Sequence, residues 1–197
     1  SATDLGDISL GLAWQPFKAG GRIPATILTF GVSLPTGSSP YEINYDDELS
    51  TGSGHYALQT GISLSKVIDP LVAFGSLNYT YGFPESGLSQ IIYEDPNDPS
   101  SRIYLTEVEP GQSFGLAFGF GYALSYQASM NLAGQLGYSL GSKYTNAGSG
   151  GASTESSTGS TLSASLNIGT GWRITAARSA YASMGIGLTN NDPDVSI

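Results

Sequence analysis

The chain has 197 residues, with 27 glycines, no cysteine, one histidine (His55) and a formal net charge of −9. The length suits one ordinary domain, and the absence of cysteine excludes a disulfide framework and thiolate metal ligands. A single histidine excludes a zinc site with two histidine ligands, and the acidic balance argues strongly against nucleic acid, which needs clustered Lys and Arg.

Eight segments alternate between apolar and polar residues with a period of two, as half-buried strands do. In chain order they are residues 8–14, 25–34, 56–65, 71–82, 113–125, 127–139, 161–172 and 180–188. Segment 113–125 is the clearest, because its even positions are large and apolar while its odd positions are all Ser, Gly or Ala. The many glycines also make these segments poor helices.

The eight segments contain no Asp, Glu, Lys, Arg or Pro. A water-soluble sheet protects its solvated face and its edges with charged residues. Here the second face carries Gly, Ser, Ala, Asn and Gln, which suits a crowded or water-lined interior, and the apolar face then requires hydrocarbon. Since open edges cannot survive in hydrocarbon, the sheet must close. The sequence therefore predicts an all-β fold, a transmembrane antiparallel up-and-down β-barrel.

The connections between these segments alternate between short and long, as in outer-membrane barrels with tight periplasmic turns and long external loops. The long ones are residues 35–55, 83–112 and 140–160. Aromatic residues sort into two rows beside these connections, which predicts two interfacial girdles. The girdle residues are Trp14, Tyr122 and Trp172 beside the short turns, and Tyr56, Tyr79, Tyr81, Phe114 and Tyr138 beside the long loops.

The direction of the strands bears on the strand count. If the short turns are periplasmic, segment 8–14 starts and segment 180–188 finishes on the outer side, whereas bacterial barrels keep both termini periplasmic. We therefore expect residues 1–197 to be a single outer-membrane domain that is incomplete at both ends, with its eight strands part of a ten- or twelve-stranded barrel. The alternative is a closed eight-stranded barrel, which requires segment 8–14 to pair directly with segment 180–188.

Five short stretches spread over nearly the whole chain share glycine-rich patterns: Gly6–Leu10, Leu34–Gly37, Leu49–Gly54, Gly75–Tyr81 and Gly187–Asp194. Together they resemble the outer-membrane family named for the meta-pathway of phenol degradation, and more loosely the barrel of functional-amyloid secretion channels. The first resemblance implies an outer-membrane barrel that passes a substrate, with small hydrophobic or aromatic solutes as its cargo. The second implies the export of amyloid subunits. Neither resemblance supplies catalytic residues.

The polar positions of the alternation are the residues expected to line the interior. Their neutral amides and hydroxyls can replace part of a solute's hydration, or they can satisfy one another inside a filled barrel. The predicted lumen residues are Gln59, Ser63, Asn78, Asn131, Gln135, Ser163, Ser165 and Asn167. Lys66 and Arg173 follow the short-turn ends of their strands, where they either form a charged ring at the mouth or snorkel to headgroups.

Acidic residues gather in the loops, at Asp46–Glu48, Glu94–Asp98 and Asp192–Asp194, without the spacing of an EF-hand. We expect a solvated external rim there, no metal site and no cofactor. An enzyme is not expected, since His55 is the only histidine available as a base. The predicted partners are outer-membrane lipid and a transported solute or exported polypeptide, with a homotrimer as one open oligomeric state. A secreted soluble β-sandwich acting as an adhesin or binding module is the alternative from another class.

Overall fold

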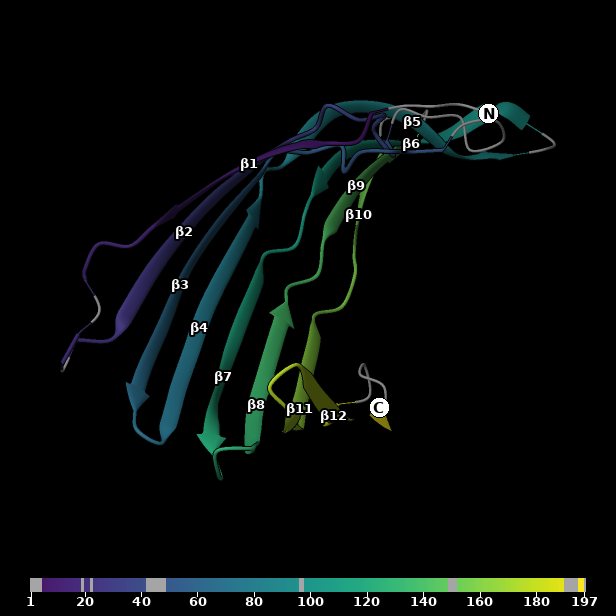
Figure 1. Ribbon diagram of the computed structural model, residues 1–197. Coiled ribbons are helices and arrows are strands. Elements are labelled where there is room, and N and C mark those ends of the chain that lie inside the picture. Colours follow the sequence, from purple (N-terminus) through teal and green to yellow (C-terminus); the bar gives the residue numbers. More distant parts are fainter. Residues whose placement is uncertain are drawn as a thin grey trace.

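The computed structural model describes residues 5–18, 20–21, 23–41, 49–95, 98–148, 152–189 and 195–196. Within these ranges every regular element is a strand, and the strands pair antiparallel in two sheets (Figure 1). The described part of the chain includes no long apolar helix of the kind that crosses a membrane.

The larger sheet has nine strands in the order β1-β2-β3-β4-β7-β8-β11-β12-β13. Their bounds are β1 Ile8–Trp14, β2 Ala25–Leu34, β3 Ala57–Ile68, β4 Leu71–Gly82, β7 Ser113–Ala123, β8 Ala128–Ser139, β11 Thr161–Thr175, β12 Arg178–Gly187 and β13 Val195–Ser196. Each of the eight segments predicted from the alternation is one of these strands, in the predicted order and with its ends shifted by a few residues. The all-β, antiparallel prediction is confirmed.

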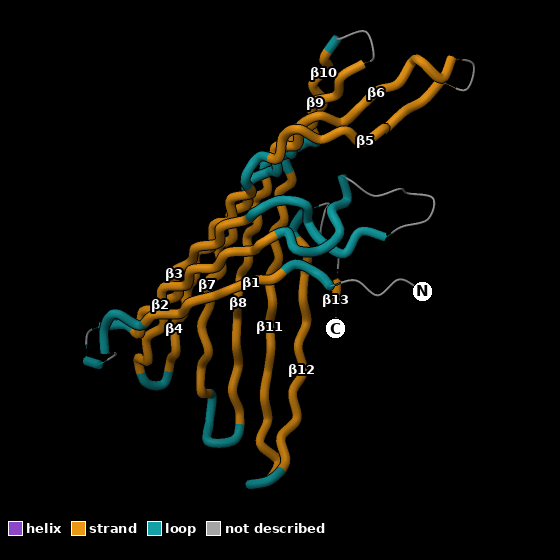
Figure 2. The backbone as a smooth tube through the Cα atoms, turned by 90° about the horizontal axis from the view of Figure 1, so that it is seen from above, coloured by secondary structure: helices purple, strands orange, loops and turns teal. Residues whose placement is uncertain are grey.

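The smaller sheet has four strands in the order β10-β9-β6-β5. Their bounds are β5 Glu85–Asp95, β6 Asp98–Glu109, β9 Lys143–Gly148 and β10 Ser153–Ser157. The sequence prediction was wrong here, because it treated both parent segments as loops. These strands carry charges such as Glu107 and Lys143, so a search for uncharged alternation misses them. Figure 2 shows the smaller sheet projecting beyond the ends of the long strands.

Among the described residues, the buried hydrophobic cluster is small and lies in the smaller sheet. Leu88, Leu105 and Val108 form it, with Tyr41 and Tyr144 packed against it, and Val108 is only 1% exposed. Tyr41 comes from the connection between β2 and β3, so this cluster joins that connection to the smaller sheet.

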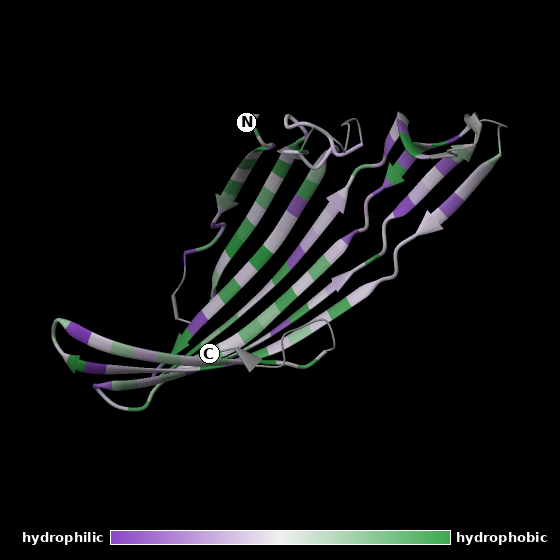
Figure 3. Cartoon of the chain, turned by 90° about the vertical axis from the view of Figure 1, so that its right-hand side faces the viewer, coloured by the Kyte–Doolittle hydropathy of each residue, from purple (hydrophilic) through white to green (hydrophobic). Residues whose placement is uncertain are grey.

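The two faces of the larger sheet differ in polarity over most of its width. The apolar exceptions on the polar side are Ile27, Val67, Val72, Phe74 and Tyr181. Successive residues of a strand point to opposite faces, and Figure 3 shows the resulting bands of apolar and polar positions along the long strands. Large apolar side chains on one face remain exposed, with exposed fractions of 65% for Leu10, 53% for Phe118 and 50% for Leu162. No protein layer covers this face within the described residues.

The edges of the larger sheet bear on the closed eight-stranded alternative. Among the described strands, β1 pairs only with β2, and β12 pairs with β11 and β13. The direct pairing of β1 with β12 that a closed eight-stranded barrel requires is therefore not formed, and the sheet is curved and open (Figures 1 and 2).

The sandwich alternative requires two sheets packed face to face. Every pair of elements in substantial contact among the described residues is a pair of hydrogen-bonded neighbours in one sheet. The two sheets therefore do not form a sandwich in this part of the chain.

Candidate functional site

The predicted lumen residues lie on one face of the larger sheet. Its register pairs Gln59 with Thr80, Ser63 with Ser76, Asn78 with Gly115, and Ala117 with Gln135, and Gln135 in turn with Ser165. All eight predicted residues occupy positions of the same face as these pairs, which we call the polar face. It runs from β3 through β4, β7 and β8 to β11.

Several hollows open on the polar face. One of about 150 Å³ lies at the short-turn end beside Arg173 and Tyr181, and two others, which we call the first and second hollow, are bordered by predicted lumen residues. The first, of about 410 Å³, lies over β1 to β4 and is bordered by Thr29, Gln59, Asn78 and Thr80. The second, of about 380 Å³, lies over β4, β7, β8 and β11 and is bordered by Asn78, Gln135, Ser163 and Ser165. Asn78 borders both hollows. The structure thus brings together five of the eight predicted lumen residues, while Ser63, Asn131 and Asn167 lie on the same face outside the two hollows.

Glycines on neighbouring strands make room for the polar side chains. A Cβ atom on Gly61 would lie 2.5 Å from Asn78 Oδ1 and 2.6 Å from Thr29 Oγ1, and one on Gly137 would lie 2.6 Å from Ser163 Oγ. Each of these polar groups therefore lies above a glycine, and any larger residue at that position would displace the polar group. The glycine content of the strands has this direct structural use on the polar face.

The two predicted mouth charges do not belong to a common ring. Lys66 lies inside β3 and pairs with Ala73, while Arg173 lies inside β11 and pairs with Ser179, because both strands continue past their predicted ends. The register places Arg173 on the polar face and Lys66 on the apolar face. Of these two, Arg173 alone can face a path along the polar side.

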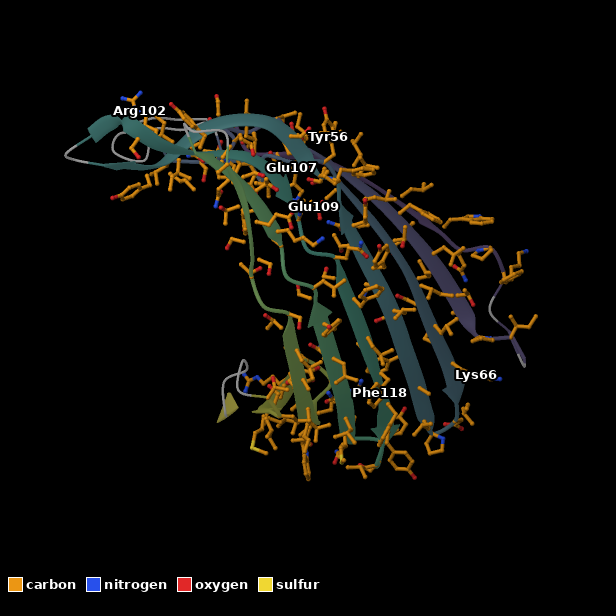
Figure 4. The ribbon with its side chains drawn as sticks, turned by 180° about the vertical axis from the view of Figure 1, so that it is seen from behind. Tyr56, Lys66, Arg102, Glu107, Glu109 and Phe118 are labelled. Carbon is orange, nitrogen blue, oxygen red and sulfur yellow. The ribbon has the colours of Figure 1, made fainter. Side chains whose placement is uncertain are left out.

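The aromatic residues predicted as girdles all occupy positions of the apolar face. At the end with the long connections, Tyr79 stacks on Phe114 with ring centroids 4.7 Å apart, and its hydroxyl donates to Gln112 Oε1 at 2.9 Å. At the opposite end lie Trp14, Tyr122 and Trp172, and Trp172 is 59% exposed. Figure 4 shows Tyr56 and Lys66 at the two ends of β3.

One carboxylate joins three separate segments at the end of β1, and sequence reasoning missed it. Asp7 Oδ2 accepts hydrogen bonds from the Ser53 amide at 2.7 Å and the Ser53 hydroxyl at 2.6 Å, and Oδ1 accepts from the Gly37 amide at 3.1 Å. The hydroxyl and amide of Ser53 hold the pKa of the Asp7 carboxyl below its ordinary value. We call Asp7, Gly37 and Ser53 the Asp7 knot.

Threonine side chains reinforce the Asp7 knot. The Ile8 amide donates to Thr36 Oγ1 at 3.0 Å, and Thr36 Oγ1 donates to the Gly6 carbonyl at 3.1 Å. Thr51 Oγ1 likewise donates to the Leu5 carbonyl at 3.0 Å. Three of the stretches that carry the family resemblance thus meet in space, and their shared Gly-Asp and Thr-Gly patterns are the signal that could have predicted the contact.

A family profile described as "Putative MetA-pathway of phenol degradation" matches residues 1–196. The chain belongs to this family. The match agrees with the first of the two resemblances seen in the sequence and spans both sheets. The looser resemblance to amyloid secretion channels stays a prediction.

In this member of the phenol-degradation MetA family, Asp7, Ser53 and His55 lie together but are not arranged as a nucleophile with its base. The Ser53 hydroxyl donates directly to Asp7, and His55 Nδ1 donates to the Ser53 carbonyl oxygen at 3.0 Å. A base must reach the hydroxyl proton of its nucleophile. The three residues therefore serve to hold the connection before β3 in place.

Charged residues of the described part gather on the smaller sheet. Lys143 Nζ lies 3.2 Å from Glu109 Oε2, with both side chains about half exposed, and Figure 4 shows Glu107 and Glu109 together on β6. The acidic stretches predicted as a rim, Asp46–Glu48 and Asp192–Asp194, lie outside the described residues, as do the side chains of Glu94–Asp98. Among the described residues no group of three potential metal ligands occurs.

Proposed function

We propose that the larger sheet is part of the wall of an outer-membrane β-barrel channel that passes small uncharged solutes. One observation carries the proposal: the apolar face is exposed across the whole sheet, while the other face is polar and almost free of charge. A sheet with this distribution buries its apolar side chains only when hydrocarbon covers them.

The energetics support a membrane setting for the apolar face. Burying one large apolar side chain completely contributes about 1.5–3 kcal/mol, so a half-exposed one still has about 1 kcal/mol to gain. Leu10, Phe118, Leu162 and Trp172 are among many such side chains on this face. Ten of them together would gain roughly 10 kcal/mol, which is comparable to the whole net stability of a folded domain.

The open edges of the sheet must also be satisfied. In hydrocarbon every backbone N–H and C=O group needs a partner, and only closure of the sheet provides one along both edges. We take two edges to be closed by further strands, in keeping with the ten or twelve strands expected from the sequence: the edge at β1, and the edge at β12, where β13 pairs only with Gly185 and Ile186. Outer-membrane lipid then covers the apolar face. Whether the protein assembles into a homotrimer can be tested by cross-linking in the membrane.

The polar face sets the kind of solute. Arg173 is the one charged side chain on this face within the described parts of the eight long strands, so the path offers hydrogen bonds rather than counter-charges. Neutral amides and hydroxyls replace part of the hydration of a neutral solute. The family resemblance points to small hydrophobic or aromatic cargo, and no observation on the described residues favours the export of amyloid subunits.

A matched pair of substitutions tests the membrane proposal. Phe118 and Ala117 are neighbours on β7 and point to opposite faces. An arginine near the bilayer midplane costs about 2–4 kcal/mol on a lipid-facing site, so we expect Phe118→Arg to reduce folding into phospholipid vesicles at least tenfold. The control Ala117→Arg points into the lumen and should insert like the wild type.

Insertion is measured by flotation with vesicles and protection from added protease, and conduction by single-channel recordings in planar bilayers. Equal insertion of the two variants would contradict the assignment of the faces. Quantitative extraction of the protein in buffer without detergent, as a folded species, would contradict the membrane setting altogether.

A further inference from the structure

We infer that the two hollows of the polar face form one binding track for a neutral polyhydroxyl solute, such as a small sugar alcohol, and that Asn78 is the residue which determines this specificity. The inference rests on the proposed channel function but departs from the aromatic cargo that the family resemblance implies, because it assigns the chemical class of the solute from the residues of the polar face.

The polar side chains that border the hollows are alike in chemistry, and the rest of the lining is glycine, alanine and residues whose side chains belong to the apolar face. Thr29, Gln59 and Thr80 border the first hollow, and Gln135 and Ser165 border the second. All are neutral amides or hydroxyls that both donate and accept hydrogen bonds, as the hydroxyl groups of a polyol do. Each hollow, at about 400 Å³, has the size of a small-molecule site.

The two long amides have unused hydrogen-bonding capacity. In the part of the chain that the structure describes, the side chains of Asn78 and Gln135 make no hydrogen bond to another residue, and both are exposed on the polar face. A solute that enters the second hollow can therefore bond to both amides without breaking a contact within the protein. This gain is absent for a solute that carries no hydroxyl or amide group.

Asn78 stands between the hollows with its amide oriented toward both. Its Oδ1 lies over Gly61 on the side of the first hollow, 2.5 Å from where a Cβ would be, and its Nδ2 lies 3.9 Å from the corresponding position on Gly115 at the second. One amide group, which carries both a donor and an acceptor, therefore borders both hollows. A polyol with several hydroxyls along its chain can engage both at once.

Rings and charges are missing from the track. Phe30 and Tyr79 belong to the first hollow only through their backbone, since their side chains point to the apolar face, where Tyr79 stacks on Phe114. An aromatic solute therefore finds no ring to stack on in either hollow. A charged solute would lose hydration without meeting an opposite charge. Among small solutes this selects the neutral, hydroxyl-rich ones.

The test measures binding of xylitol to the full-length protein in detergent micelles, by ligand-observed NMR, and compares two variants. Asn78→Leu keeps the side-chain size but removes both polar groups, and we expect it to weaken xylitol binding about fivefold. The control Asn131→Leu makes the same change on the same face outside both hollows, and it should bind xylitol like the wild type. Benzyl alcohol, an aromatic probe with one hydroxyl, should bind more weakly than xylitol.

Equal binding of xylitol by all three proteins, or tighter binding of benzyl alcohol than of xylitol, would overturn the inference. Circular dichroism in the same micelles must show equal strand content for the two variants. If Asn78→Leu does not fold, Asn78→Ala, which also removes both polar groups, repeats the comparison with the same expected loss of xylitol binding. Single-channel recordings separate the two proposals. Conduction without xylitol binding refutes the binding track alone, whereas binding without conduction refutes the channel.

Discussion

Replacing Asp7 by Asn should release the connection between β2 and β3 from the start of β1. The carboxylate accepts three hydrogen bonds, from the Gly37 amide and from the amide and hydroxyl of Ser53. An Asn side chain keeps one acceptor oxygen and presents an NH₂ group to the remaining donors, so at least one bond is lost and the others lose their charge. Hydrogen bonds to charged groups contribute about 1.5–3 kcal/mol, and Asp7 is only half-buried, so we expect a local cost of about 2 kcal/mol.

Hydrogen exchange at the Gly37 and Ser53 amides measures this effect directly. A loss of about 2 kcal/mol corresponds to roughly 30-fold faster exchange in Asp7→Asn at pH 7. Because the pKa of Asp7 is lowered in the folded protein, its contribution is complete above the unfolded-state pKa of about 3.9 and disappears as the pH falls through the lower folded-state pKa. The exchange rates of wild type and variant should therefore converge in acid. An unchanged rate at pH 7, or an equal difference at pH 7 and pH 2, would refute the reasoning.

Three further outcomes are expected. Leu105→Ala should lower the free energy of unfolding by about 2–3 kcal/mol, because Leu105 belongs to the small buried core. Hydrogen exchange should become faster in β5, β6 and β9 only, and equally faster exchange throughout the larger sheet would contradict this. Gly54→Ala should lower the free energy of unfolding by at least about 1–2 kcal/mol, since Gly54 has φ +72° and a Cβ atom there would meet the Tyr41 ring. Proteolysis between β2 and β3 should become faster, and resistance to the protease equal to that of the wild type would contradict this. Lys143→Ala should shift the unfolding free energy by less than about 1 kcal/mol, because its pair with Glu109 is exposed and screened by salt; a larger, salt-insensitive loss in denaturant titrations would argue against this.

The long strands were predictable because apolar and polar residues alternate over most of their length. The segment around Phe118 has small residues at every odd position, and its partner β8 alternates in the same way, so period alone locates these two strands. In β4 the pattern is weaker, because Val72 and Phe74 lie on its polar face. The face of each predicted lumen residue follows from the same alternation. The charges Lys66 and Arg173 were harder to place, because the ends of a strand depend on how far its partner continues the ladder.

The strands of the smaller sheet could not be predicted by the same rule. β6 mixes Arg102 and Glu107 with Ile103 and Leu105, and its pairing with β9 joins two connections that are far apart in the sequence. Its stability comes from the small cluster around Val108 rather than from a local pattern. Such long-range pairs carry no local signal of their own.

The local order of polar and apolar residues therefore settled the strand identity and the two unlike faces of the larger sheet, since a strand can orient its side chains only in alternation. Folding in three dimensions settled which distant groups meet: Asp7 with Ser53, and Asn78 with both hollows. These contacts depend on the register between strands and on the glycines that let side chains lean across it, and neither is a property of any one segment of the chain.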